Sequence, residues 1–114
     1  MIIRRSEMQS EVRDRMRGGE GSVRITHLVQ KEALPHGRLL AEIEIPPGAG
    51  IGEHEHTAET EYFLIEQGTG VAVDDGRESR ITAGDVLVTG GGARHSIRND
   101  SDAPLRLVAL IIVH

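Results

Sequence analysis

The sequence predicts an all-β domain, built either as an antiparallel sandwich or as a small barrel. From Val23 onward, apolar and polar residues alternate with a period of two in short stretches rich in β-branched side chains. Turn residues separate these stretches, and no convincing helical pattern follows residue 20. Many short strands with close turns are typical of sandwiches and barrels, and a barrel has no exposed strand edges.

Residues 1–20 differ from the rest of the chain, and we expect them to form an N-terminal arm beside a β-barrel of residues 21–114. Three apolar residues recur in the arm at a spacing of four: Met8, Val12 and Met16. A short helix over 6–17, ended by Gly18, and an ordered extended arm are both open interpretations. A helix of this length without packing partners is marginal.

The strands that we expect beyond the arm are short. They cover residues 23–29, 38–45, 61–66, 69–75, 77–82, 85–89 and 105–113. Asp75-Gly76, between two of these stretches, predicts a hairpin turn. The last stretch, "LRLVALIIV", is apolar but half as long as a membrane span, so it reads as a strand buried on both faces.

Length and charge exclude several classes of protein. At 114 residues the chain has room for one domain. A net charge of −5 and the lack of any basic run argue against nucleic acid or anionic membrane as a partner. There is no cysteine, and the first residues lack the apolar core of a signal peptide. We therefore expect a cytoplasmic protein.

Two histidines and a glutamate are crowded within residues 48–68. On a strand, His54 and His56 project to the same side, because alternate residues share a face. Glu61 is in phase with Phe63 and should point into the core. A buried carboxylate beside imidazoles is costly unless a cation compensates it. A solvated surface turn is the alternative, but the shared phase favours a divalent metal site.

The spacing of these residues resembles that of the two motifs of the cupin family. The first motif is Gly48, five residues, His54-x-His56, four residues, Glu61, six residues and Gly68. The second is Gly84, five residues, Gly90-x-Gly92, two residues, His95, three residues and Asn99. The family usually has proline where this chain has Gly90.

This resemblance implies a single cupin barrel, which is a double-stranded β-helix or jelly roll. It also implies one bound metal, with His54, His56, Glu61 and His95 as ligands. Only the resemblance points to His95, because a lone histidine in a loop more often has no such role. The chain from "GSVRITHLV" onward is similar to small single-domain bacterial cupins, some of which are called oxalate-decarboxylase-like.

Three imidazoles and one carboxylate suit Mn, Fe, Co, Ni or Zn. We favour one Mn ion per chain, since Mn(II) or Fe(II) would keep two open positions for a small acid or dioxygen. A tetrahedral zinc would instead have all four of its positions filled by these ligands, so its role would be structural.

Three functions are compatible with such a site. We favour a metal-dependent enzyme, a lyase (decarboxylase) or an oxygenase (dioxygenase), acting on a small carboxylate or oxygenated metabolite. The alternatives are a non-catalytic binding or sensing module, and a barrel whose metal is purely structural.

We assign no catalytic residue. The strand phase predicts that Arg38 lies on the surface and that Arg94 and Tyr62 point away from the site. His27 shares a face with apolar residues, so it either packs in the core or lines a pocket, and packing is favoured.

The final expected strand also predicts a homodimer. One face carries Leu105, Leu107, Ala109, Ile111 and Val113, and the other carries Arg106, Val108, Leu110 and Ile112. Only one face can point into a barrel, and the second is too apolar for open water. A second subunit is the favoured cover, and the N-terminal arm is the alternative.

Overall fold

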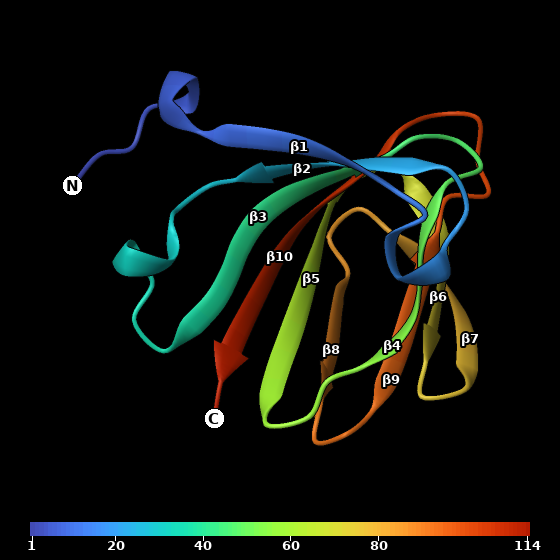
Figure 1. Cartoon of the computed structure of the whole chain (residues 1–114). Coiled ribbons are helices and arrows are strands. Elements are labelled where there is room, and N and C mark those ends of the chain that lie inside the picture. The colour runs from blue at the N-terminus through green and yellow to red at the C-terminus, as the bar shows by residue number, and fades with distance from the viewer.

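The computed structural model describes residues 1–114, which form ten strands and three short 3₁₀ turns (Figure 1). The strands are β1 (Gln9–Asp14), β2 (Ser22–His27), β3 (Gly37–Ile45), β4 (Gly50–Glu55), β5 (Glu59–Gln67), β6 (Thr69–Asp74), β7 (Arg77–Thr82), β8 (Val86–Gly90), β9 (Arg94–Arg98) and β10 (Leu105–Val113). The 3₁₀ turns are η1 (Arg5–Glu7), η2 (Met16–Gly18) and η3 (Lys31–Ala33). The all-β prediction is confirmed. No helix here has the length and apolar character to cross a membrane.

The strands form two antiparallel sheets that face each other (Figure 1). The six-stranded sheet has the order β1-β2-β3-β10-β5-β8, and the four-stranded sheet has the order β4-β9-β6-β7. As expected, β6 and β7 form a hairpin, in which Asp75 and Gly76 both take positive φ angles of 48° and 86°. Two positive φ angles at the tip match the right-handed twist of the paired strands.

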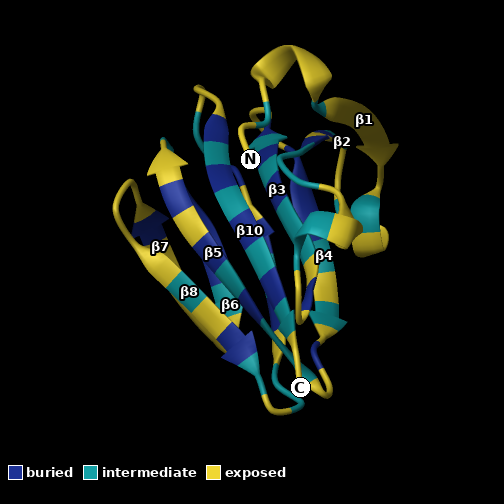
Figure 2. Cartoon of the chain, turned by 90° about the vertical axis from the view of Figure 1, so that its left-hand side faces the viewer, coloured by how far each residue is buried: buried dark blue, intermediate teal, exposed yellow.

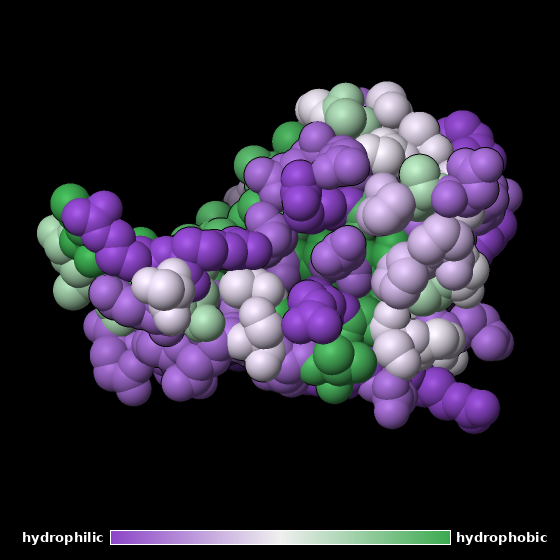
Figure 3. Space-filling model, turned by 90° about the horizontal axis from the view of Figure 1, so that it is seen from above, coloured by the Kyte–Doolittle hydropathy of each residue, from purple (hydrophilic) through white to green (hydrophobic).

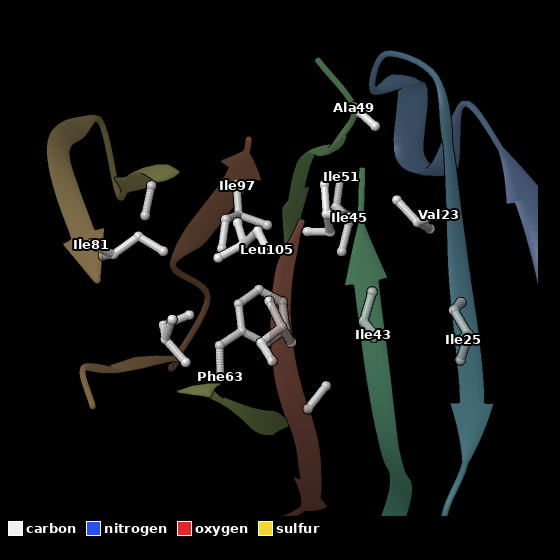
Figure 4. Packing of buried hydrophobic residues seen from close by; sticks show 14 of the residues in the cluster. Val23, Ile25, Ile43, Ile45, Ala49, Ile51, Phe63, Ile81, Ile97 and Leu105 are labelled. Carbon is white, nitrogen blue, oxygen red and sulfur yellow. The ribbon is translucent and has the colours of Figure 1, made fainter. Parts of the chain in front are cut away.

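The core lies between the two sheets and is almost entirely aliphatic (Figure 4). Ile97 of β9 packs opposite Leu105 of β10, and Phe63 of β5 lies close to both (Figure 4). Along β10 the burial alternates, with Leu105 to Ile111 buried at every second residue. The predicted period of two is therefore the period of the core-facing side chains.

The helical interpretation of residues 6–17 is wrong, and the extended arm is what forms. β1 pairs with β2 at the edge of the larger sheet, and all six of its residues are exposed. A spacing of four is an even number, so it fits a strand as well as a helix. The edge of β2 offers backbone hydrogen bonds that decide between the two. Viewed from above, the N-terminal end of the chain projects from the barrel (Figure 3).

The glycine-rich loop before His95 takes backbone conformations that are open mainly to glycine. Gly91 and Gly92 have φ angles of 65° and 87°, a region that side chains with a Cβ rarely adopt. Gly90 lies against Thr60 of β5, where a Cβ would approach the threonine hydroxyl within 2.5 Å. The loop thus reverses tightly and feeds β9 into the barrel with His95 at its start.

Candidate metal centre

Strands from both sheets bring the four predicted ligands together. His54 lies on β4 and His56 follows its end, Glu61 lies on β5, and His95 lies on β9. His54 is directly opposite His95 in the β4–β9 ladder. Ile51 and His54 both face inward although they are three residues apart, because the ladder is irregular between them. Such a bulge re-aims a side chain without ending the strand.

The ligand atoms of these four residues converge on one point. All lie within 4.8 Å of one another. Oε1 of Glu61 is 2.8 Å from Nε2 of His56 and 2.9 Å from Nε2 of His95. Nε2 of His95 is also 3.0 Å from Nε2 of His54. Lone pairs that meet at this distance repel unless a proton or a cation lies between them, so the cluster can hold one metal ion.

The other ring nitrogen of each histidine has its own partner. Nδ1 of His54 donates to the carbonyl oxygen of Gly52 at 2.8 Å, and Nδ1 of His95 lies 2.8 Å from the Thr89 hydroxyl. Nδ1 of His56 contacts the Glu59 carboxylate at 2.5 Å. With a proton on each Nδ1, all three Nε2 atoms present lone pairs to the centre, as metal-binding histidines do.

The charge states within the cluster are those that a metal requires. Burial by itself would raise the pKa of Glu61, but hydrogen bonds that the His54 and His95 rings donate outweigh it and lower the pKa to about 2, and a cation at this point would take the place of the donated protons. Burial lowers the pKa of His95, and Glu61 opposes this effect only in part. At neutral pH the carboxylate is therefore ionised and the His95 ring is neutral, which are the binding forms of both ligands.

A cavity of about 240 Å³ opens onto the cluster. His54, His56 and Glu61 line it, whereas His95 lies behind them and stacks on Phe63 with ring centroids 4.8 Å apart. The remaining lining is apolar or basic: Ile25, Leu39, Ile43, Ile51, Phe63, Ile111, Met16, Arg13, Arg17, His27 and Arg38. A cavity of this size and character suits a small anion.

The residues outside the ligand set were predicted with mixed success. Arg94 points away from the site, as expected, and pairs with Glu53 at 2.9 Å. His27 lines the cavity rather than packing in the core, and its Nε2 lies 2.9 Å from Glu11. Arg38 is exposed, as the surface prediction expects, with 45% of its side chain accessible, but it also borders the cavity. An irregularity in the β3–β10 ladder near Arg38 changes the phase that the alternation implies.

Sequence reasoning missed Glu59, which links Arg38 to the metal cluster. Arg38 binds both carboxylate oxygens of Glu59, at 3.0 and 2.9 Å, and Glu59 in turn contacts Nδ1 of His56. Hydrogen bonding to Arg38 lowers the pKa of Glu59, against the effect of burial. A signal was present, since Glu59 is in strand phase with Glu61 and two residues before it.

We expect Glu59→Gln to weaken metal binding by roughly 10- to 100-fold, the usual effect of removing the carboxylate behind a metal-binding histidine. The amide keeps the size of the side chain but loses the charge that orients His56. Competition with a chelating dye measures the affinity. Glu53→Gln is the control, because Glu53 is an exposed carboxylate paired with Arg94. Equal affinities in the two variants would contradict the role of Glu59.

The chain is similar to known proteins along its whole length. Residues 41–113 match the Cupin domain family. A protein of Thermotoga maritima called oxalate-binding protein is 42% identical over 114 residues, which cover 99% of this chain and 94% of that protein. Dimethylsulfoniopropionate lyase DddW of Ruegeria pomeroyi is 36% identical over 76 residues, covering 66% of this chain and 49% of the lyase.

Solved structures agree with the sequence matches. The crystal structure of a predicted oxalate decarboxylase from Thermotoga maritima superposes with a TM-score of 0.95, at 42% identity and with 100% of both chains covered. A cupin-2 domain from Rhodospirillum rubrum, at 19% identity, shares the fold with a TM-score of 0.80, covering 100% of this chain and 75% of the other. This chain belongs to the cupin family.

Proposed function

We propose that the chain holds one divalent transition metal on His54, His56, Glu61 and His95 and binds a small dicarboxylate of the oxalate type there. The convergence of three Nε2 atoms and one carboxylate oxygen at a small cavity carries this proposal. We favour Mn(II), because four protein ligands leave room for two carboxylate oxygens on an ion that prefers six. The name of the Thermotoga maritima relative, oxalate-binding protein, supports the choice of ligand.

The residues around the cluster support anion binding. When bound, the metal supplies positive charge for the carboxylate of the ligand. Ile51, Phe63 and Ile111 line the cavity with apolar surface, which excludes water and strengthens electrostatic attraction. Arg38, through Glu59, keeps the His56 ring in one orientation. The side chains of the site are thus already ordered before the ligand binds, which lowers the entropy cost of binding.

Isothermal titration with oxalate tests this proposal. We expect saturable binding of one oxalate per chain in Mn-loaded protein, and loss of that binding in protein stripped with a chelator. Acetate has one carboxylate and can chelate a metal only through a strained four-membered ring, whereas oxalate forms a five-membered ring, so acetate should bind much more weakly. Oxalate binding that survives metal removal, or its absence from loaded protein, would contradict the proposal.

Catalysis on the bound acid is the second candidate function. The 36% identity to dimethylsulfoniopropionate lyase DddW favours lyase chemistry, and open positions on the metal also suit an oxygenase. Incubation of Mn-loaded protein with oxalate under air, followed by assay of formate and carbon dioxide, separates an enzyme from a binding protein. Product formation that is lost with the metal would favour the enzyme.

A further inference from the structure

The N-terminal arm forms one wall of the ligand cavity. Arg13 comes from β1, and Met16 and Arg17 come from η2; all three line the cavity beside the metal cluster. Figure 1 shows how the chain reaches this place, since the blue loop containing η2 crosses from the larger sheet to β4. The barrel strands alone therefore leave the cavity incomplete.

Glycines on both sides hold this loop against β4. A Cβ on Gly52 would overlap the carbonyl oxygen of Arg17, and a Cβ on Gly19 would overlap that of Gly50. Only residues without a side chain permit this approach. The carbonyl oxygen of Gly52 also accepts the hydrogen bond from Nδ1 of His54. The backbone of Arg17 thus lies directly on the segment that orients a metal ligand.

The backbone of Arg17 is in a conformation that arginine rarely adopts. Its φ and ψ are 53° and 31°, in the left-handed region, and Arg15 has a φ of 48°. Two hydrogen bonds close this loop, from Arg15 N to Gly21 O at 2.8 Å and from Gly50 N to Glu20 O at 2.9 Å. Unfavourable conformations persist where surrounding contacts fix them, often at ligand sites.

The charges around the cavity single out Arg17. Arg13 is paired with Glu11, and Arg38 with Glu59. Arg17 also lines the cavity but forms no ion pair and no side-chain hydrogen bond in the structure. It is therefore the cavity arginine whose guanidinium is free to bind an incoming anion, and a guanidinium matches a carboxylate with two parallel hydrogen bonds.

We propose that Arg17 is a specificity-determining residue, which binds the outward-facing oxygens of a dicarboxylate whose other oxygens lie on the metal. This inference rests on the proposed function. It assigns the N-terminal arm a role in ligand selection, with the four metal ligands contributed by the barrel alone. The expected preference is for a second carboxylate over a neutral group of the same shape.

Oxalate and oxamate provide the comparison, because oxamate replaces one carboxylate with a neutral amide. We expect Arg17→Ala to weaken oxalate binding roughly tenfold or more, the usual value of a charge-assisted hydrogen bond, and to change oxamate binding little. The matched control is Arg15→Ala, which removes an arginine at positive φ from the same loop but outside the cavity. Metal content should stay at one per chain in both variants.

Gly19→Ala tests the role of Arg17 by a second route, because it disturbs the contact between the loop containing η2 and β4. The added methyl group displaces η2 from β4 while all four metal ligands remain, so oxalate affinity should fall and metal content should not.

If wild-type protein binds oxalate and Arg17→Ala binds it equally well, the inference is wrong and the proposed function stands. Equal losses in Arg15→Ala and Arg17→Ala would also overturn it. If loaded wild-type protein binds no oxalate, the proposed function fails first.

Discussion

Replacing both His54 and His56 with alanine should abolish stoichiometric metal binding and leave the protein soluble. The change removes two of the four converging ligand atoms, and Glu61 and His95 alone make a poor site for a divalent ion. His56 is buried, but both rings contact the other polar side chains of the cluster and the aliphatic core between the sheets is left intact, so the barrel should still fold. Elemental analysis of dialysed protein measures the metal per chain.

A matched control removes two histidines from elsewhere. His36 lies in the turn before β3, and His114 is the last residue, so His36→Ala/His114→Ala should bind metal as the wild type does. A fully loaded His54→Ala/His56→Ala protein would show that the ligand assignment is wrong.

Metal removal should also lower the thermal stability of the wild type. A ligand present at 100 times its dissociation constant stabilises the folded state by about 2.7 kcal/mol. For a chain of this size that corresponds to a fall in Tm on the order of 10 °C when a chelator strips the metal. The double variant should melt at the same temperature with and without chelator, because it has no bound metal to lose.

The sequence could predict the ligands that lie on regular strands, and it could not predict from strand alternation those that depend on a bulge or a short strand. Strand phase alone predicted that Glu61 points inward, and Glu61 is buried between His56 and His95. The alternation of residues along a strand could not predict the bulge that turns His54 inward together with Ile51. His95 required the resemblance to cupins, because its strand is too short for alternation to carry much information.

The arm shows the limit of local patterns more clearly. Its spacing of apolar residues fits both a helix and a strand, and pairing with β2 decided the outcome. Arg17 reaches the cavity through the path of a loop and two close glycine contacts, which no periodic pattern encodes. Contacts of this kind depend on segments distant in sequence, so they are visible only in the folded chain.

Homodimer formation is the other prediction with a large expected effect, and the outer face of the six-stranded sheet is its basis. Figure 2 looks onto this face. Leu110 of β10 lies beside Leu40 and Tyr62 in the ladders, and β5 in turn pairs with β8. The large aliphatic side chains Leu64, Val86 and Val88 are exposed by 44%, 56% and 51%.

The N-terminal arm, the alternative cover, lies elsewhere in the fold. β1 pairs with β2 at the far edge of the sheet from β5 and β8. The arm reaches the outer face of this sheet only where Arg5 pairs with Glu42 of β3 at 2.8 Å, so it leaves the apolar side chains of β5 and β8 exposed and those of β10 half-buried. A contiguous apolar patch on a small domain commonly marks a protein interface, and a two-fold partner presenting the same patch would bury it.

We expect wild-type protein to be a dimer at micromolar concentration and Leu110→Asp to be a soluble monomer. In a two-fold dimer the substitution places two unpaired carboxylates in one apolar interface, and each costs several kcal/mol to bury. Light scattering after size exclusion measures both masses. Val12→Asp is the control, because Val12 is an exposed aliphatic residue, at 59%, on β1 at the opposite end of the sheet. A monomeric wild type, or a Leu110→Asp protein of unchanged mass, would rule out this interface.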